Sequence, residues 1–242
     1  MGRSSAGPAG PPRTAVPDAA SVRAAAGWVA AGCVLVGAVA VTVAVAAGPG
    51  SPAGGYVSEA GVPDSALAST YRMGVFTLAA ALLALAAALP TALRAAAVLL
   101  AAGAVGAVLS GAVTCSAGCP LPPFEAATPA DLVHGGASIA AVGVTVLAML
   151  VIGFLRPATP ALRRVARVSG VLALPVAGAT ALGLLTVGRG GLLGGLERLL
   201  LAICVGWGLL TALLLTRHRP AARSVPDGAE HDEPVAASRT PL

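Results

Sequence analysis

The chain has 242 residues, of which 57% are hydrophobic and only 10% are charged, and its mean hydropathy is +0.87. Soluble domains carry roughly 25% charged residues and about 45–50% apolar ones. The composition therefore excludes a water-soluble fold and a disordered chain, and it indicates a membrane protein. The net charge of +5 does not indicate nucleic-acid binding, because the basic residues lie at the ends of apolar segments instead of on one face.

Two residue types limit the cofactors that this chain could use. All fifteen basic residues are Arg, so the sequence offers no lysine for a retinal Schiff base, for pyridoxal phosphate or for a phosphate-binding loop. Of the three histidines, His218 and His231 lie in the hydrophilic C-terminal segment, which leaves His134 alone at membrane depth. A haem held by two histidines, or a histidine-rich metal site, would lack ligands. We therefore expect no cofactor and no metal.

Six apolar stretches are long enough to cross a bilayer, whose core of about 30 Å requires about 20 apolar residues per helix. They lie near residues 24–47, 73–90, 95–114, 132–155, 168–187 and 198–216. We predict an all-α fold, a polytopic transmembrane bundle of six helices over residues 23–216. The first stretch also has features of a secretory signal, but it is longer than the usual apolar region of about 7–15 residues, which favours a retained helix.

The distribution of arginine predicts the orientation of the bundle. With the N-terminus inside, only Arg72, Arg189 and Arg198 lie outside, and the other twelve of the fifteen lie inside. This bias has the sign of the positive-inside rule, so we predict a plasma-membrane protein with both termini cytoplasmic. Residues 1–22 and 217–242 are rich in Pro, Gly, Arg and acidic side chains without apolar periodicity, and we predict two disordered cytoplasmic tails.

The longest predicted inner loop contains Arg163, Arg164 and Arg167. The simplest interpretation is that these residues set topology. The alternative is that they contact anionic lipid headgroups. The lipid bilayer is the only partner that the sequence indicates, and neither a protein partner nor an oligomeric state follows from it.

Polar residues that topology does not explain gather in the outer segments. The candidate ligand-binding residues there are Glu59, Arg72, Asp131, His134, Glu197 and Arg198. Buried charges need partners, so we expect a network joining Glu59 or Asp131 to Arg72 or Arg198. The network would either fasten loops and helix ends or form the rim of an outward-facing pocket, in which the two arginines hold a carboxylate or phosphate headgroup.

Asp131 and His134 open the fourth predicted helix. Asp131 is suited to be the N-cap or a first-turn acid, and we expect His134 to be a mostly neutral ring that donates an N–H to Asp131 or to an outer-loop carbonyl. Ser138 lies one turn beyond His134, and we expect its hydroxyl to bond back to the carbonyl of His134. A membrane-embedded hydrolase using Asp131, His134 and Ser138 is the alternative interpretation of these three residues.

Cys115 and Cys119 lie four positions apart in the second outer segment. This spacing is compatible with the Cα separation of about 4.4–6.8 Å that a disulfide requires, and the predicted outer location favours oxidation. We predict a structural disulfide. A redox-active pair and half of a metal site are the alternatives, although no second cysteine pair is present to complete a zinc site.

Short motifs resemble those of the domain of unknown function 998 family, a group of bacterial, mainly actinobacterial, integral membrane proteins. They are Ser58-Glu59, Arg72 with Gly74, Asp131-Leu132-Val133-His134-Gly135, and Gly195-Leu196-Glu197-Arg198 with Trp207. The resemblance spans roughly residues 24–216. It implies a multi-pass membrane protein with six helices and no assigned activity.

The sequence contains no catalytic spacing that points to one reaction, and we assign no catalytic residue. We predict a non-enzymatic protein that binds or moves a small amphiphile, or supports a membrane partner, through the outer polar residues. The hydrolase described above is the alternative.

Overall fold

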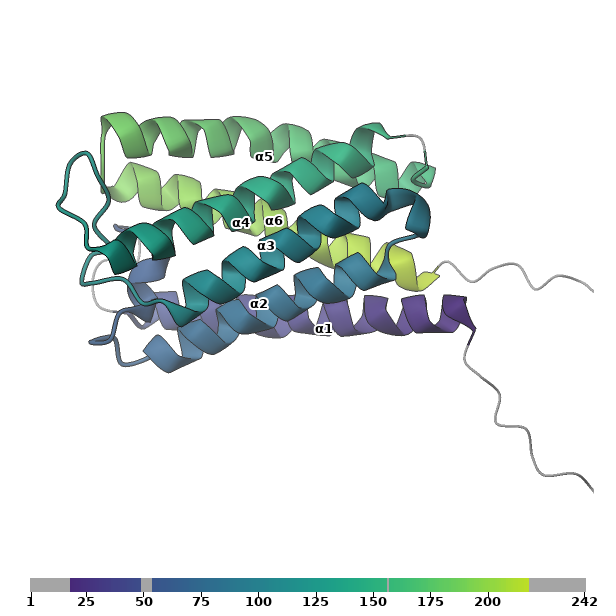
Figure 1. Cartoon of the computed structure of the whole chain (residues 1–242), viewed down its shortest axis with the longest axis horizontal. Helices are drawn as coiled ribbons and strands as arrows, with labels where there is room; N and C mark the ends of the chain where they lie inside the picture. Colours follow the sequence, from purple (N-terminus) through teal and green to yellow (C-terminus); the bar gives the residue numbers. More distant parts are fainter. Residues whose placement is uncertain (1–17, 49–53, 156, 218–242) are drawn as a thin grey trace, which may run out of the picture.

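The computed structural model describes residues 18–48, 54–155 and 157–217, which form six long helices and two short 3-10 turns and contain no strand (Figure 1). The elements are α1 Ala19–Ala46, η1 Val57–Gly61, α2 Ala68–Ala88, η2 Thr91–Leu93, α3 Arg94–Ala112, α4 Pro129–Phe154, α5 Pro160–Thr186 and α6 Gly191–Arg217. All six long helices have the length and composition to cross a membrane. The predicted all-α bundle of six helices is confirmed, and the chain is a multi-pass membrane protein.

The six helices form a closed ring. Each helix packs against the next one along the chain, and α6 packs back against α1. Because the helices alternate in direction, α1 begins and α6 ends at the same end of the bundle, here called the termini end (Figure 1). The opposite end, here called the loop end, carries the connections within residues 54–67, 113–128 and 187–190.

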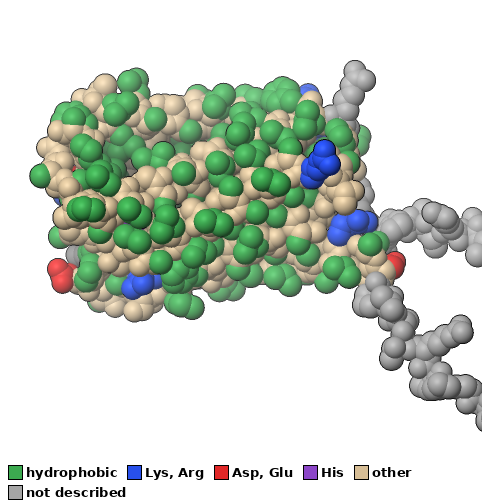
Figure 2. Space-filling view, in the orientation of Figure 1, with side chains coloured by type: hydrophobic (Ala, Val, Ile, Leu, Met, Phe, Trp, Pro, Cys, Tyr) green, Lys and Arg blue, Asp and Glu red, His purple; other side chains and the backbone are tan. Residues whose placement is uncertain are grey.

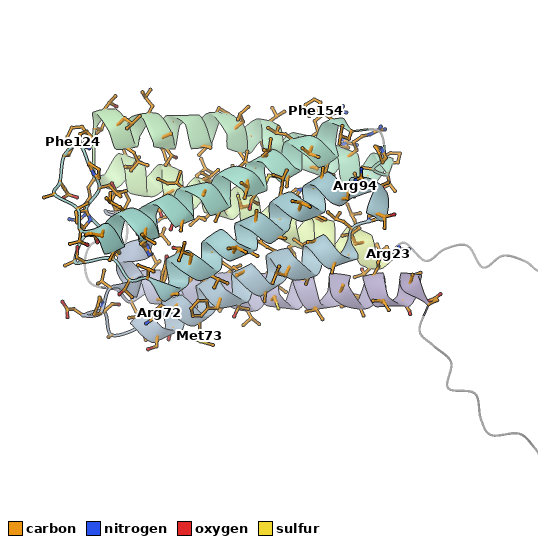
Figure 3. The ribbon with its side chains drawn as sticks, in the orientation of Figure 1. Arg23, Arg72, Met73, Arg94, Phe124 and Phe154 are labelled. Carbon is orange, nitrogen blue, oxygen red and sulfur yellow. A yellow bond between two sulfur atoms is a disulfide. The ribbon has the colours of Figure 1, made fainter. Side chains whose placement is uncertain are left out.

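The surface of the bundle has the polarity of a membrane protein. Apolar side chains cover its length, while the visible arginines and acids lie near the two ends (Figure 2). Arg23, Arg94 and Phe154 lie at the termini end, whereas Arg72 and Phe124 lie at the loop end (Figure 3). The predicted disordered tails fall largely on residues 1–17 and 218–242, which are outside the described residues. Residues 19–22 of the first predicted tail belong to α1.

Helix starts are set by side-chain caps. The Asp18 carboxylate accepts a 2.8 Å hydrogen bond from the backbone N–H of Ser21, which caps α1. Thr128 caps α4 in a capping box with Asp131, and Pro129 occupies the first turn, where its missing N–H costs nothing. Thr159 and Pro160 start α5 in the same way. These polar residues fix where each apolar run becomes a helix.

Helix α5 begins eight residues earlier than predicted. Arg163, Arg164 and Arg167 therefore lie in its first turns and not in a long loop. The hydropathy pattern leaves this arginine-rich segment out of the predicted helix. Arginine is nevertheless a good helix former, and the Thr159 cap allows the helix to begin before it. Helix α6 likewise begins at Gly191 instead of residue 198.

Small residues allow neighbouring helices to approach closely. A Cβ atom added to Gly37 of α1 would lie 2.9 Å from the carbonyl oxygen of Gly74 in α2, and one added to Gly106 of α3 would lie 3.0 Å from the carbonyl oxygen of Ala137 in α4. In lipid, burial alone does not drive helices together, so close van der Waals packing at such residues holds the ring. By contrast, a Cβ on Gly136 would meet nothing within 4 Å.

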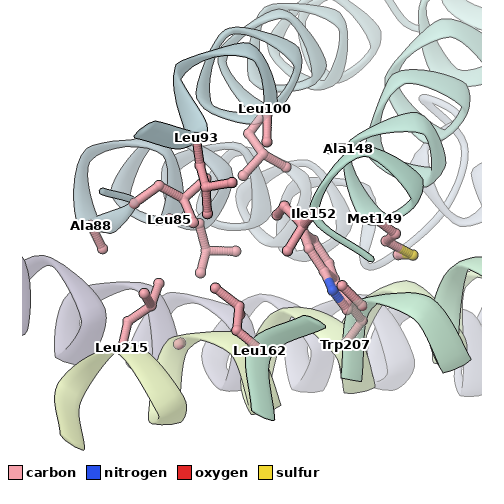
Figure 4. Packing of buried hydrophobic residues seen from close by; sticks show 14 of the residues in the cluster. Leu85, Ala88, Leu93, Leu100, Ala148, Met149, Ile152, Leu162, Trp207 and Leu215 are labelled. Atoms are coloured by element: carbon pink, nitrogen blue, oxygen red, sulfur yellow. The ribbon is translucent and has the colours of Figure 1, made fainter. Parts of the chain in front are cut away.

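The half of the bundle nearer the termini end is solidly packed. Leu100, Met149 and Ile152 are fully buried there, and Trp207 is 1% exposed. Figure 4 shows how these side chains meet from α3, α4 and α6, together with Leu85 of α2. The interior of this half is therefore closed by side chains.

Candidate functional site

The half of the bundle nearer the loop end contains a cavity of about 480 Å³, lined by residues of all six helices. Leu85 and Trp207 line its deepest part, next to the packed half, and its wall is mostly Val, Leu and Ala. Tyr56 and Ser58 line it at the loop end. The cavity is thus an apolar chamber with a polar end.

A segment at residues 54–61, here called the lid, covers the cavity at the loop end and is fastened to α6. The carboxylate of Glu197 accepts a 2.8 Å hydrogen bond from the N–H of Val57. The next residue, Arg198, donates from Nη1 to the carbonyl oxygen of Gly55 at 3.0 Å and to that of Gly194 at 2.8 Å. Two consecutive side chains of α6 therefore hold one donor and one acceptor of the lid backbone.

A bidentate ion pair fastens the lid a second time. Arg189 donates from Nε and Nη2 to the two carboxylate oxygens of Glu59 at 2.8 and 2.7 Å. This hydrogen bonding raises the pKa of the Arg189 guanidinium. Glu59 also accepts from the N–H of Tyr56, and burial raises the pKa of the Tyr56 hydroxyl, with a further contribution from the charges of Glu125 and Glu197.

The ion pair differs from the one expected from the sequence. We expected Glu59 or Asp131 to meet Arg72 or Arg198, but within the described residues Glu59 pairs with Arg189. The short connection between α5 and α6 places Arg189 over the lid, while Arg72 donates from Nε to the carbonyl oxygen of Gly111 at 3.0 Å. Both expected arginines bind backbone carbonyls instead of carboxylates.

Asp131 joins the second loop to the start of α4. Its carboxylate accepts hydrogen bonds from the backbone N–H and the hydroxyl of Ser116 at 2.7 and 2.9 Å. It also accepts from the N–H and hydroxyl of Thr128 at 2.8 and 2.7 Å. With 1% exposure and four donors, this buried carboxylate is satisfied without a cation. The expectation of a first-turn acid is confirmed.

His134 connects α4 to the end of α3. Its Nδ1 lies 2.8 Å from the carbonyl oxygens of both Ser110 and Val113, so this nitrogen carries the hydrogen and donates to them. The expected hydrogen bond to a carbonyl next to the outer loop is therefore present. The other nitrogen, Nε2, is buried without a hydrogen-bond partner, and His134 lines the cavity.

Ser138 takes part in a short hydroxyl chain. Its hydroxyl donates to the carbonyl oxygen of His134 at 2.9 Å, as expected, and lies 2.6 Å from the hydroxyl of Ser110. Within the described residues, Ser138 makes no hydrogen bond to the His134 ring and Asp131 makes none to it either. The geometry therefore does not assemble a nucleophile, a base and an orienting acid.

Cys115 and Cys119 lie beside His134. Their Cα atoms are 5.0 Å apart, within the range of a disulfide. The two Sγ atoms and one ring nitrogen of His134 also lie within 4.8 Å of one another. The same three residues could thus supply three ligands to a soft metal ion if the cysteines were reduced, an arrangement that the sequence spacing did not predict.

The candidate binding residues separate into two groups. Asp131, His134 and Glu197 line the cavity, whereas Glu59, Arg72 and Arg198 do not and act on the lid and loops. At the termini end, Arg167 donates to the carbonyl oxygen of Gly153 and lies over the ring of Phe154, with Cζ 5.1 Å from its centroid.

Three residues that form hydrogen bonds in this region are not identified from the sequence. The sequence predicts an outer position for Arg189 but does not mark it as a site residue, although it lies between two glycines. Thr128 and Asp131 have the spacing of a capping box, a pattern that would have found the cap. Nothing in the sequence marked Ser116 as a ligand of Asp131, because that contact depends on the path of the loop.

A comparison with family models matches residues 29–215 to the family described as "Protein of unknown function (DUF998)". The match covers most of the chain and contains the lid, the cavity and all six candidate binding residues. No curated protein and no solved structure matches the chain. The chain therefore belongs to the DUF998 family, as its motifs indicated.

Proposed function

We propose that this member of the DUF998 family binds a single-chain amphiphile inside its helix ring without transforming it. The observation that carries the proposal is the apolar cavity of about 480 Å³ with a polar end. Small-molecule sites typically measure about 300–1,000 Å³ and combine apolar walls with a few placed polar groups. A hydrocarbon chain would lie along the helices toward Trp207, and its headgroup would lie beneath the lid.

Exposed wall residues give the amphiphile a route from the bilayer. Ile139 of α4 lines the cavity and is 53% exposed, and Ala181 of α5 lines it and is also exposed. A Cβ on Gly143, another lining residue of α4, would meet nothing within 4 Å. Helices α4 and α5 converge toward the termini end and separate toward the loop end (Figure 1). The proposed entrance lies between these two helices.

The enzyme alternative is less well supported by the same geometry. A hydrolase would need a nucleophile within about 2.6–3.2 Å of its base, directly or through one water. The Ser138 hydroxyl instead bonds to a backbone carbonyl and to Ser110, and His134 directs its hydrogen at carbonyls. These contacts favour a binding protein in which the residues hold helices and loops in place.

Two substitutions on α3 test the cavity. Ala107 lines it, whereas Ala102 is exposed and does not. Ala107→Phe should fill part of the chamber and lower the binding of a dodecyl-chain probe about ten-fold or more, because the ring occupies volume that the probe would need. Ala102→Phe should leave binding unchanged. Native mass spectrometry of the purified protein measures probe occupancy, and equal occupancy in both variants would overturn the proposal.

We further propose that the protein lies in the plasma membrane with both termini in the cytoplasm. Among the described residues, Arg23, Arg94 and Arg217 belong to the termini end together with the arginines at the start of α5, and this surplus favours a cytoplasmic location. In intact cells, a membrane-impermeant maleimide should label Asp64→Cys at the loop end and not Ala92→Cys in η2. The reverse labelling would contradict this orientation.

The arginines at the start of α5 support a proposed contact with anionic lipid. Arg164 is exposed and Arg163 is half-buried, while Arg167 is engaged with the carbonyl of Gly153. Cytoplasmic basic residues gain about 1 kcal/mol each near an anionic surface. Arg164→Gln should therefore lower the amount of co-purified phosphatidylglycerol. Unchanged lipid content would limit these residues to a role in topology.

We also propose that Cys115 and Cys119 form a disulfide. The Cα separation of 5.0 Å and the proposed outer location support it. Mass spectrometry after blocking free thiols should find both residues joined and should find Cys33 and Cys204 alkylated. Alkylation of Cys115 and Cys119 would refute the bridge, and protection of those thiols by added Zn²⁺ would assign them, with His134, to a metal site.

A further inference from the structure

The polar side chains at this end of the cavity differ in how much hydrogen-bonding capacity they have left for a ligand. Five of the polar side chains that line the cavity already have hydrogen-bond partners. Thr145 and Thr180 donate to carbonyl oxygens of their own helices, and Ser110 and Ser138 bond to each other. Asp131 accepts from Ser116 and Thr128, as described above. These groups have little capacity left for a ligand.

His134 is the first group with free capacity. It is 5% exposed, and its Nδ1 hydrogen is directed to two backbone carbonyls. With that hydrogen on Nδ1, the other ring nitrogen, Nε2, is left as the acceptor, and it is buried and has no partner. Burying an acceptor without a partner is unfavourable, so this atom favours a ligand that donates a hydrogen bond.

Glu197 is the second such group. One of its carboxylate oxygens accepts the N–H of Val57, and within the described residues it forms no salt bridge. The adjacent Arg198 forms no salt bridge with Glu197 among the described residues, because that guanidinium is directed at the carbonyls of Gly55 and Gly194. A carboxylate lining an apolar chamber without a cation favours a positively charged partner.

These two acceptors line the same cavity. Glu197 binds the N–H of Val57 in the lid, and the neighbouring Tyr56 packs against the cluster of Val62, Cys115 and Cys119. The Sγ of Cys119 is within 4.8 Å of a ring nitrogen of His134. Both residues therefore belong to the polar end of the cavity. Trp207 Nε1, an unpartnered donor, lies ten residues further along α6, about 15 Å away at the helical rise, and does not contribute there.

The charges lining the chamber all have one sign. Asp131 and Glu197 line it, and no arginine among the described residues does so. Arg72 and Arg198, the residues expected to hold an anionic headgroup, are directed away at backbone carbonyls. A phosphate or carboxylate headgroup would thus meet two carboxylates and an acceptor nitrogen, with no arginine among the described lining residues to bind it.

We infer that the amphiphile bound in the cavity carries a primary ammonium headgroup, which donates its N–H groups to the Glu197 carboxylate and to His134 Nε2. The inference rests on the proposed function, since it assigns the chemistry of the ligand in that cavity. An ammonium is a compact cation with three donors, which a carboxylate and an acceptor nitrogen can share. A trimethylated ammonium carries the charge but has no N–H to donate.

Trp207 provides the readout for the test. The chain has two tryptophans, and Trp28 is 62% exposed on α1, so Trp28→Phe leaves Trp207 as the single fluorophore at the deep end of the cavity. The probes are dodecyl chains brominated at the terminal carbons, which quench tryptophan on contact. They carry an ammonium, a trimethylammonium, a glucoside or a phosphate headgroup. Binding is measured in nanodiscs of phosphatidylcholine.

The ammonium probe should quench Trp207 at a concentration about ten-fold or more below that of the phosphate probe, since hydrogen bonds to charged groups are worth about 1.5–3 kcal/mol. Glu197→Gln keeps an acceptor for Val57 but removes the charge, and it should abolish this preference. The matched control is Glu59→Gln, whose carboxylate belongs to the lid and does not line the cavity. It should retain the preference.

The possible failures are distinguishable. Quenching by all four probes at equal concentrations would overturn the headgroup inference while leaving the cavity function intact. If the glucoside probe quenched Trp207 at the same concentration as the ammonium probe, hydrogen bonding without charge would explain binding. That result would overturn the ammonium inference. Tighter binding of the phosphate, or a preference unchanged in Glu197→Gln, would also overturn the inference. Absence of quenching by every probe would overturn the proposed function itself.

Discussion

The two halves of the bundle are built from similar residues but differ in how they fill space. In the half near the termini end, Leu100, Ile152 and Trp207 meet in a solid core. In the half near the loop end, the ring surrounds a chamber, and hydrogen bonds of the lid and the second loop hold the helix ends. Apolar packing therefore sets the spacing of the helices in one half, while polar contacts at their ends set it in the other.

The largest contrast is expected from removing a leucine from each half. Leu100→Ala should cost about 2–5 kcal/mol, because the fully buried side chain leaves a cavity in a packed core. Leu184→Ala should cost about 1 kcal/mol or less, since Leu184 already borders the chamber and loses fewer contacts. Thermal unfolding of both variants in one detergent measures the difference. Similar losses would show that the two halves are packed alike.

His134 tests whether polar contacts hold the hollow half. His134→Leu removes the donor shared by the carbonyls of Ser110 and Val113 and should cost about 1–3 kcal/mol. His134→Gln keeps a donor of similar size and should be close to the original protein. The thermal stabilities of the two variants are compared in the same detergent. If the leucine variant is as stable as the original, the structural role is wrong and a catalytic role for His134 regains support.

A smaller effect is expected at the lid. Arg189→Gln breaks the bidentate pair with Glu59 and should cost about 0.2–1 kcal/mol, because the arginine side chain is 41% exposed and solvent screens the pair. A double-mutant cycle with Glu59→Gln isolates the coupling. The coupling energy should fall as salt is raised. A coupling energy close to zero would mean that the lid is held mainly by its backbone contacts.

The smallest effect concerns the start of α1, in the packed half. The N–H and hydroxyl of Ser21 hold the pKa of Asp18 below its usual value of 3.8. Because the folded-state pKa is lowered, this cap stabilises the protein above about pH 4 and is lost as the pH falls through the folded pKa. Asp18→Ser keeps a cap that does not titrate. Its thermal stability should fall less between pH 5 and pH 3, and an identical fall would exclude a role for the cap.

The sequence predicts the helices better than it predicts their contacts. Six apolar runs give six helices, because the length of a bilayer-spanning segment is a local property. The starts of α5 and α6 are missed because Arg163 and Glu197 lower the hydropathy of segments that are helical. Capping residues such as Thr159 would have corrected the first of these boundaries.

The candidate site is predicted in composition but not in pairing. Its acids, arginines and histidine all lie near the loop end, as topology requires. Their partners depend on loop paths: Arg189 reaches Glu59 across 130 positions, and Ser116 reaches Asp131 across 15. The chamber itself has no sequence signature, because an alanine facing a void and an alanine facing a neighbouring helix look the same.

The closure of the ring between α1 and α6 has a consequence for biogenesis. The ribosome delivers the first helix long before the last, and consecutive helices can form hairpins as they enter the membrane. The contact between α1 and α6 forms only after the whole domain has been inserted. Until then, the face of α1 that includes Gly27 lacks its contact with Thr216 of α6. The chamber, which residues of all six helices line, is therefore complete only when the final helix has been inserted.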